Sequence, residues 1–173
     1  MLKAITFHKE LRSGSSLPIL LSANDSQSYI LKPFGSGDGT MSSIVEWLTS
    51  QFGISLGLPI LEPVLIDVDS NFIHQAKDPE TFELLGRSVG TNFATPYMDS
   101  SQPYTTALDH HLPQDTKAYI YLFDLLVLNI DRTLLNPNMI IQDRHLWCLD
   151  YSSCFAIRNI VNGKTSNEDM LLT

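Results

Sequence analysis

The chain has 173 residues, enough for one ordinary domain with a hydrophobic core. Its 43% hydrophobic and 17% charged residues are typical of a globular protein and exclude a disordered one. The net charge of −8, without any run of lysines and arginines, argues against direct nucleic-acid binding, which needs clustered basic side chains. There is no apolar run of ~18 residues and no long apolar signal region, so we expect a cytoplasmic protein without membrane partners.

The first half of the chain predicts a β-rich region. Residues 18–21 and 29–32 are short apolar runs separated by turn residues, and they predict neighbouring strands of an antiparallel hairpin. Residues 60–68 predict another strand, in which Pro63 indicates an edge position or a bulge. Residues 90–97 are expected to be extended.

One helix is predicted within this region, after a glycine-rich loop at residues 34–39. Ser42 or Ser43 is its candidate N-cap. Four apolar residues share one face of it: Ile44, Val45, Leu48 and Phe52. Residues 69–81 are expected to be a loop, and residues 82–89 are ambiguous.

The second half predicts a connector, a buried helix and a hairpin. Residues 97–113 are rich in Asp, Ser, Thr and Pro and form the connector. Residues 115–129 are apolar nearly all round, and after the initial Asp115 only Lys117 and Asp124 carry charge, which predicts a buried helix. A buried Asp124 needs partners, and we expect the backbone of the following loop to supply them. Residues 139–149 predict a β-hairpin, so the order of elements indicates an α+β fold with two lobes.

Three polar residues around this hairpin carry the functional prediction. Asp131 is followed five residues later by Asn136 and nineteen residues later by Asp150. Kinases use such a set in this order: one carboxylate accepts the proton of the attacking hydroxyl, while an amide and a second carboxylate hold Mg²⁺ on the phosphates. Asn138 is a further candidate that helps to hold the loop. Each residue has an alternative role: Asp131 as a helix-terminating partner of Arg132, Asn136 as a turn residue, and Asp150 as a surface residue at a strand end.

The two cysteines flank Asp150. We expect Cys148 and Cys154 to be reduced core thiols, with a disulfide across six residues as the alternative. No spacing of Cys and His suggests a zinc site.

Five segments follow one another in an order shared with a known family. They are residues 12–18, 29–33, 45–46 and 57–63, and the block 123–138 together with Leu149 and Asp150. The last block is the most specific of the five. Together they resemble the HipA-like kinases, which are bacterial Ser/Thr protein kinases known mainly as toxins of toxin–antitoxin pairs.

The resemblance implies a two-lobed, protein-kinase-like α+β fold in one domain over residues 1–173. Residues 1–97 would form the β-rich lobe, and residues 98–173 would form an incomplete helical lobe with the catalytic and metal-binding loops. Two features depart from the family. Val45 stands where the family has Asn, and the chain ends twenty-three residues after Asp150, where the family continues with several helices. A fragment, a natural minimal kinase and a degenerate kinase all fit this pattern.

The resemblance also implies a nucleotide site. Lys32 would neutralise phosphate oxygens of ATP, with a water-facing lysine at a strand end as the alternative. Glu46 would pair with Lys32, or else it would close a capping box with Ser43. Ser15 and Ser16 would belong to a loop that covers the phosphates through backbone N–H groups and is subject to autophosphorylation, or to a plain hairpin turn.

The function implied by the resemblance is an ATP- and Mg²⁺-dependent transfer of phosphate to a hydroxyl group of a protein. Substrates in the family include translation-related proteins, and an antitoxin or another protein is the expected partner. Two alternatives stay open: an inactive or weak pseudokinase that regulates a partner, favoured by Val45 and the short helical lobe, and a small-molecule kinase of related architecture. The sequence specifies neither the phosphate acceptor nor the oligomeric state.

Overall fold

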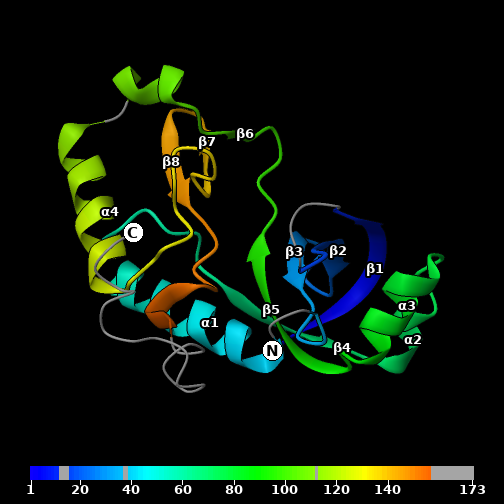
Figure 1. Cartoon of the computed structure of the whole chain (residues 1–173). Coiled ribbons are helices and arrows are strands. Elements are labelled where there is room, and N and C mark those ends of the chain that lie inside the picture. The colour runs from blue at the N-terminus through cyan, green and yellow to red at the C-terminus, as the bar shows by residue number, and fades with distance from the viewer. Residues whose placement is uncertain (12–15, 37–38, 112, 157–173) are drawn as a thin grey trace.

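The computed structural model describes residues 1–11, 16–36, 39–111 and 113–156. Within them, five strands of the first half close into a barrel (Figure 1). The strands are β1 (Leu2–Glu10), β2 (Ile19–Ala23), β3 (Ser28–Lys32), β4 (Val64–Val68) and β5 (Gly90–Pro96). They follow the order β1-β2-β3-β5-β4, and a parallel pairing of β1 with β4 closes the barrel, whereas the other neighbours are antiparallel.

The predicted hairpin of β2 and β3 is confirmed. Ile19 lies opposite Leu31 in the antiparallel register. Ile19, Leu21 and Leu31 have no exposed surface, and the residues between them are less buried, as the two-residue period of a strand requires. Lys32 is therefore the last residue of a strand whose register is fixed by the core. The extended segment predicted at residues 90–97 is also confirmed, as β5.

The helix of the first half, α1 (Gly39–Ser55), begins before the predicted caps and buries a different face. Ile44, Leu48 and Phe52, which the apolar pattern grouped together, are exposed. The buried face consists of Val45, Glu46, Thr49, Ser50 and Gly53. The small side chains of this face allow close packing, and its glutamate brings a carboxylate toward Lys32. A count of apolar residues detects neither the close packing nor the inward carboxylate.

Two short helices, α2 (Ser70–Ile73) and α3 (Pro79–Gly86), begin in the predicted loop at residues 69–81, and α3 continues into the segment 82–89 that was left ambiguous. The carboxylates of Asp69 and Asp78 accept hydrogen bonds from backbone N–H groups in the first turns of α2 and α3. Pro79 occupies the first turn of α3, where its missing N–H costs nothing. Both N-caps are visible in the sequence, but the helices are too short to show an apolar period.

The second half contains a three-stranded sheet of β6 (Gln102–Pro103), β7 (Met139–Gln142) and β8 (His145–Cys148), in that order. The predicted hairpin is thereby confirmed. Asp143 and Arg144 form its turn, and both have positive φ angles, of 50° and 65°. A two-residue turn of this kind matches the twist of the flanking strands, so the turn fixes the register of β7 and β8.

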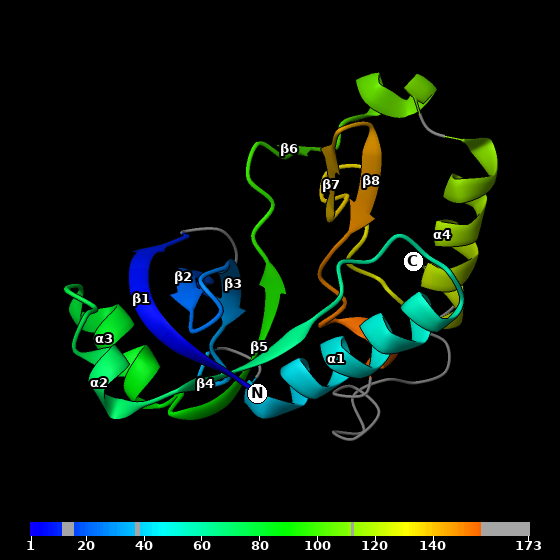
Figure 2. The same cartoon turned by 180° about the vertical axis from the view of Figure 1, so that it is seen from behind.

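The helix α4 (Gln114–Leu126) follows the 3₁₀ helix η1 (Thr106–His111) and stands beside the second sheet (Figure 2). Ile120 and Phe123 are buried against the hairpin. The prediction of a buried helix is wrong for the described residues, because an outer stripe is exposed. The stripe comprises Tyr119, Leu122 and Leu126. In the described part of the chain, no helix is long and apolar enough to cross a membrane.

Buried apolar residues form two clusters. The first fills the barrel and extends to α2 and α3. The second lies between α1, α4, the β7–β8 hairpin and the 3₁₀ helix η2 (Cys154–Ala156). Val45 and Ile60 pack in the second cluster, and Ile60 forms an isolated bridge with Cys148 in place of the strand start predicted there. The structure thus has mixed α and β content, while the division into lobes at residue 97 stays a prediction.

The close approach of α1 to the second cluster depends on Gly53. A Cβ at this position would collide with Cδ1 of Ile60 and lie 3.0 Å from Cζ of Phe123. We expect Gly53→Ala to lower the free energy of unfolding by about 1–3 kcal/mol, because overpacking outweighs the gain in helix propensity. In the control, Gly86→Ala, the Cβ meets nothing within 4 Å. This variant should be neutral or more stable by up to about 1 kcal/mol in urea unfolding, and equal stabilities would contradict the packing argument.

Candidate active site

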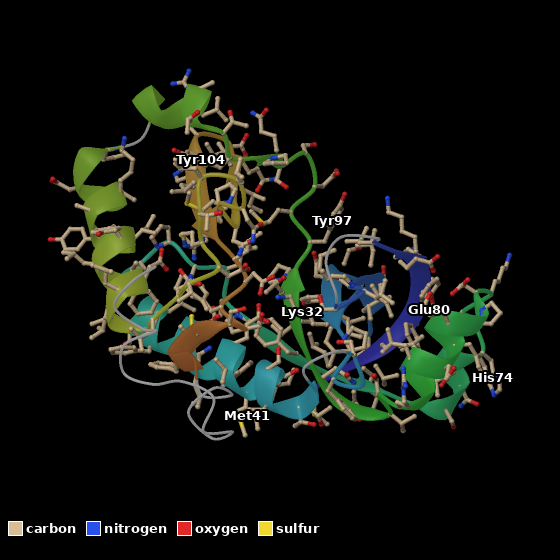
Figure 3. All side chains as sticks on the ribbon, in the orientation of Figure 1. Lys32, Met41, His74, Glu80, Tyr97 and Tyr104 are labelled. Atoms are coloured by element: carbon tan, nitrogen blue, oxygen red, sulfur yellow. The ribbon has the colours of Figure 1, made fainter. Side chains whose placement is uncertain are left out.

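Lys32 joins three separate elements at the centre of the site. Its Nζ donates to Glu46 Oε1 at 2.7 Å and to Oε2 at 2.9 Å, and it lies 2.9 Å from Asp150 Oδ1. Lys32 comes from β3, Glu46 from α1, and Asp150 from the segment after β8. In Figure 3, Lys32 lies between the barrel and the hairpin. The structure therefore brings three of the predicted site residues into one cluster.

The alternative roles proposed for Lys32 and Glu46 do not fit this geometry. The Lys32 side chain is 17% exposed, so it does not simply point to water. Ser43 lies inside α1 and is not its N-cap, so Glu46 closes no capping box with it. Glu46 is 2% exposed, and its carboxylate is held by Lys32 instead.

Burial controls the ionisation of this cluster. Burial raises the pKa of Glu46 to about 7, with Asp150 adding to the rise and Lys32 opposing it. Burial acts to lower the pKa of Lys32, but the charges of Glu46 and Asp150 outweigh it and raise that pKa. Burial acts to raise the pKa of Asp150, yet Lys32 and Ser152 together hold it below its usual value. Of the two carboxylates, Asp150 is thus the more firmly ionised.

Asp131 lies in a loop held by amide side chains. Its Oδ2 accepts hydrogen bonds from Asn136 Nδ2 at 3.1 Å and from Asn138 Nδ2 at 3.0 Å. Asp131 neither ends a helix nor pairs with Arg132, because α4 ends at Leu126 and Arg132 pairs with Asp124 at 2.7 Å. The carboxylate of Asp131 is therefore oriented by two amide donors.

The loop of Asp131 and the segment of Asp150 meet through backbone. The N–H of Leu149 donates to the carbonyl of Asn138 at 2.8 Å. Asn138 and Asp150 have φ angles of 47° and 55°, a left-handed conformation that is uncommon for residues other than glycine. Strained backbone of this kind is frequent at functional sites, and two of the nine described non-glycine residues with positive φ lie here.

Sequence reasoning missed the role of Arg132. Its Nη1 donates to the carbonyl oxygens of Pro137 and Asn138, each at 2.7 Å, while its Nε pairs with Asp124. We expected the loop backbone to satisfy Asp124, whereas the side chains of Arg132 and Asn129 do so. The available signal was the buried Asp124 in α4, which needed a charged partner rather than a backbone donor.

The donor set fits a hard divalent cation. Asn136 turns its Nδ2 toward Asp131, which leaves the amide oxygen to another partner. The Asp150 carboxylate adds a second oxygen donor, and its contacts with Lys32 and Ser152 both fall on Oδ1. Across the described residues there is no group of three or more His, Cys, Asp or Glu side chains that could hold a metal. Two protein donors suit Mg²⁺, which keeps several waters and binds together with phosphates.

The role predicted for Ser15 and Ser16 stays a prediction. Ser15 lies outside the described residues, and Ser16 lies in the turn before β2. Cys148 and Cys154 are free and buried, as predicted. Burial raises the pKa of Cys148 to about 11 and that of Cys154 to about 12, so both stay protonated thiols at neutral pH.

A barrel lysine paired with a helix glutamate, next to a carboxylate–amide loop and a second carboxylate, is the arrangement of side chains that kinase-like phosphotransferases use. The sequence matches the model of the HipA-like kinases over residues 4–165. The chain therefore belongs to the HipA-like kinase family, and the prediction from the sequence motifs is confirmed.

A solved structure supports the same fold. The chain is similar to the Helicobacter pylori proinflammatory kinase CtkA, with a TM-score of 0.57 and 15% sequence identity. The match covers 96% of this chain and 65% of CtkA, so the chain spans less than two thirds of the length of that kinase. At this identity the likeness concerns the fold alone. A comparison with curated proteins finds no match.

The raised pKa of Glu46 leads to a prediction about its titration. In protein free of nucleotide and metal, ¹³C NMR should show the Glu46 carboxyl titrating near pH 7. Asp150→Asn should move this titration to lower pH, because it removes a negative neighbour, whereas Asp143→Asn in the exposed β7–β8 turn should not.

The same shift has a consequence for stability. The folded-state pKa of Glu46 lies above the ordinary value of 4.5, so ionisation of Glu46 destabilises the folded state. Its contribution to stability is fully present below about pH 4.5 and is lost as the pH rises through about 7. A Glu46 that titrates at its ordinary value in the wild type would contradict the burial argument.

Proposed function

We propose that this protein transfers the γ-phosphate of ATP, in the presence of Mg²⁺, to a Ser or Thr hydroxyl of a protein. The observation that carries the proposal is the hydrogen bond between Leu149 N–H and the Asn138 carbonyl. It joins the loop that contains Asp131 to the segment that contains Asp150. The proposed proton acceptor and the proposed oxygen donors are therefore linked through one backbone contact, and Asp150 lies beside Lys32.

Each residue has a defined part in such a transfer. Asp131, oriented by two amide donors, accepts the proton of the acceptor hydroxyl as its oxygen bonds to phosphorus and the bond to the ADP oxygen breaks. Lys32, fixed by Glu46, supplies a positive charge to phosphate oxygens. Asn136 and Asp150 would hold Mg²⁺, which when bound neutralises charge on the β- and γ-phosphates.

The protein acceptor and the partners are inferred from the family. HipA-like kinases act on proteins, including translation-related ones, and pair with antitoxins, so we infer a protein substrate and a protein partner for this chain as well. CtkA is named as a kinase, which supports phosphate transfer as the activity. Transfer to a small hydroxyl compound but not to protein would instead favour the small-molecule alternative.

A specific observation favours a second function, that of a binding module without turnover. The outer faces of α1 and α4 expose apolar stripes, which is typical of surfaces that contact another protein. These stripes comprise Ile44, Leu48 and Phe52 on α1, and Tyr119, Leu122 and Leu126 on α4. A pseudokinase would bind a partner stably, yet it would transfer no phosphate even at high protein concentration.

Two substitutions separate these functions. Asp131→Asn should lower the rate of phosphate transfer by about 10²–10⁴-fold and leave nucleotide affinity near that of the wild type, because the proton acceptor does not hold the nucleotide. Asp150→Asn should lower both, because it removes an oxygen donor of the metal site. The exposed turn variant Asp143→Asn serves as the control for both.

The measurement combines labelled ATP with calorimetry. Transfer of ³²P to the protein itself or to cell extract gives the rate, and titration with Mg²⁺-ADP gives the affinity. Phosphoproteomics of cells that express the wild type or Asp131→Asn then identifies the acceptor. Equal transfer by the wild type and Asp131→Asn would rule out Asp131 as the proton acceptor.

A further inference from the structure

We propose that Arg132 is a positioning residue, which sets the loop of Asn136 against the segment of Asp150 so that both side chains can bind the same metal ion. This inference rests on the proposed function for the presence of a metal–nucleotide complex. It adds a residue that neither donates to the metal nor accepts the proton, and that contacts the loop through the carbonyl groups of Pro137 and Asn138.

The hydrogen bonds of Arg132 span the whole loop. Its Nε pairs with Asp124 Oδ2 of α4 at 2.7 Å, and its Nη1 reaches the carbonyls of Pro137 and Asn138, also at 2.7 Å. The side chain is only 7% exposed, and that of Asp124 is 12% exposed. A guanidinium presents donors in a fixed planar fork, so these three bonds set the distance between α4 and the far end of the loop.

The second contact of Arg132 leads to the metal-binding segment. Its Cζ lies 4.9 Å from the centre of the Tyr151 ring, within the range of a cation–π interaction. Tyr151 follows Asp150 directly and is fully buried. The centre of its ring also lies 5.7 Å from the centre of the Phe123 ring of α4, and the two ring planes are 79° apart. Tyr151 is therefore wedged between Arg132 and α4, which limits the backbone freedom of Asp150.

Asn138 is the point where both sets of contacts meet. Its carbonyl accepts from Arg132 Nη1 and from Leu149 N–H, while its side chain donates to Asp131. A shift of the guanidinium would therefore move this carbonyl. It would thereby change the position of Asn136 relative to Asp150. Replacing residues that orient metal ligands without binding the metal themselves typically changes metal affinity by about 10–100-fold.

A purely structural salt bridge is the competing explanation. It predicts that loss of Arg132 lowers the stability of the fold but leaves the metal affinity of the folded protein unchanged. Metal affinity, measured on protein shown to be folded by circular dichroism, therefore distinguishes the two explanations. Mn²⁺ with ADP is a suitable probe, because its binding can be followed by electron paramagnetic resonance without any turnover.

The experiment compares three variants of the full chain. Arg132→Lys keeps the charge but not the fork, and we expect it to weaken Mn²⁺ binding in the presence of ADP by about 10–100-fold. Asp124→Asn keeps the shape but removes the negative charge that holds the guanidinium on α4 and leaves one acceptor oxygen for Arg132 and Asn129, so its metal affinity should fall in the same direction. Arg144→Lys, in the exposed β7–β8 turn, should bind Mn²⁺ like the wild type. In transfer assays, Arg132→Lys should raise the Mg²⁺ concentration required, so KM for ATP should rise at limiting Mg²⁺ and return toward the wild-type value at saturating Mg²⁺.

Each outcome decides the proposal. Wild-type Mn²⁺ affinity in folded Arg132→Lys would overturn it. If Arg132→Lys does not fold, Asp124→Asn decides in its place, and wild-type affinity in that variant would overturn the proposal equally. A wild type that binds Mn²⁺ with ADP but transfers no phosphate would refute the proposed function alone, because the comparison of affinities remains valid. A wild type that does not bind Mn²⁺ with ADP would overturn both.

Discussion

The ammonium group of Lys32 is the interaction on which the site depends, because it bridges carboxylates from two other elements. Glu46 and Asp150 lie within 2.9 Å of it. Buried charges are costly unless they are paired and hydrogen-bonded, so the charged form of the buried Glu46 depends on Lys32, which also holds the partly exposed Asp150. Lys32 can reach both carboxylates only if β3, the inward face of α1 and the end of β8 lie close together. This contact therefore constrains the positions of the barrel, the helix and the hairpin.

A second buried ion pair, between Arg132 and Asp124, organises the other half of the site. The two halves meet where Leu149 donates to the Asn138 carbonyl. The left-handed backbone of Asn138 and Asp150 is retained at this junction, on either side of the β7–β8 hairpin. Strain of about 1–3 kcal/mol at each such residue persists only where neighbouring contacts determine the conformation. The conformation of the loop that contains Asp131 thus depends on the buried contacts of Arg132 and not on the loop sequence alone.

The sequence predicted those features that depend on local patterns. Alternation and turn residues located the strand pairs, and the spacing of Asp131, Asn136 and Asp150 indicated the site and the family. The prediction of the apolar face of α1 was wrong, because Glu46 faces inward to pair with a charge on a distant strand. A count of apolar residues cannot show such a pairing. Arg132 was missed for a similar reason, since its partners are loop carbonyls and a ring whose positions exist only in the folded chain.

The charge of the Lys32 cluster explains why the site suits a cation together with a polyanion. With both carboxylates ionised, Glu46 and Asp150 carry one more negative charge than Lys32 neutralises. The rise of the Glu46 pKa to about 7 reflects its burial beside this surplus. The whole chain also has a net charge of −8, so a free polyphosphate would be repelled by the protein as a whole. A divalent cation between Asp150 and Asn136 would reverse the local sign, because it adds two positive charges where one negative charge is in excess. The same carboxylate that Lys32 holds in the nucleotide-free site would then be shared with the cation, and the ammonium would become available to phosphate oxygens.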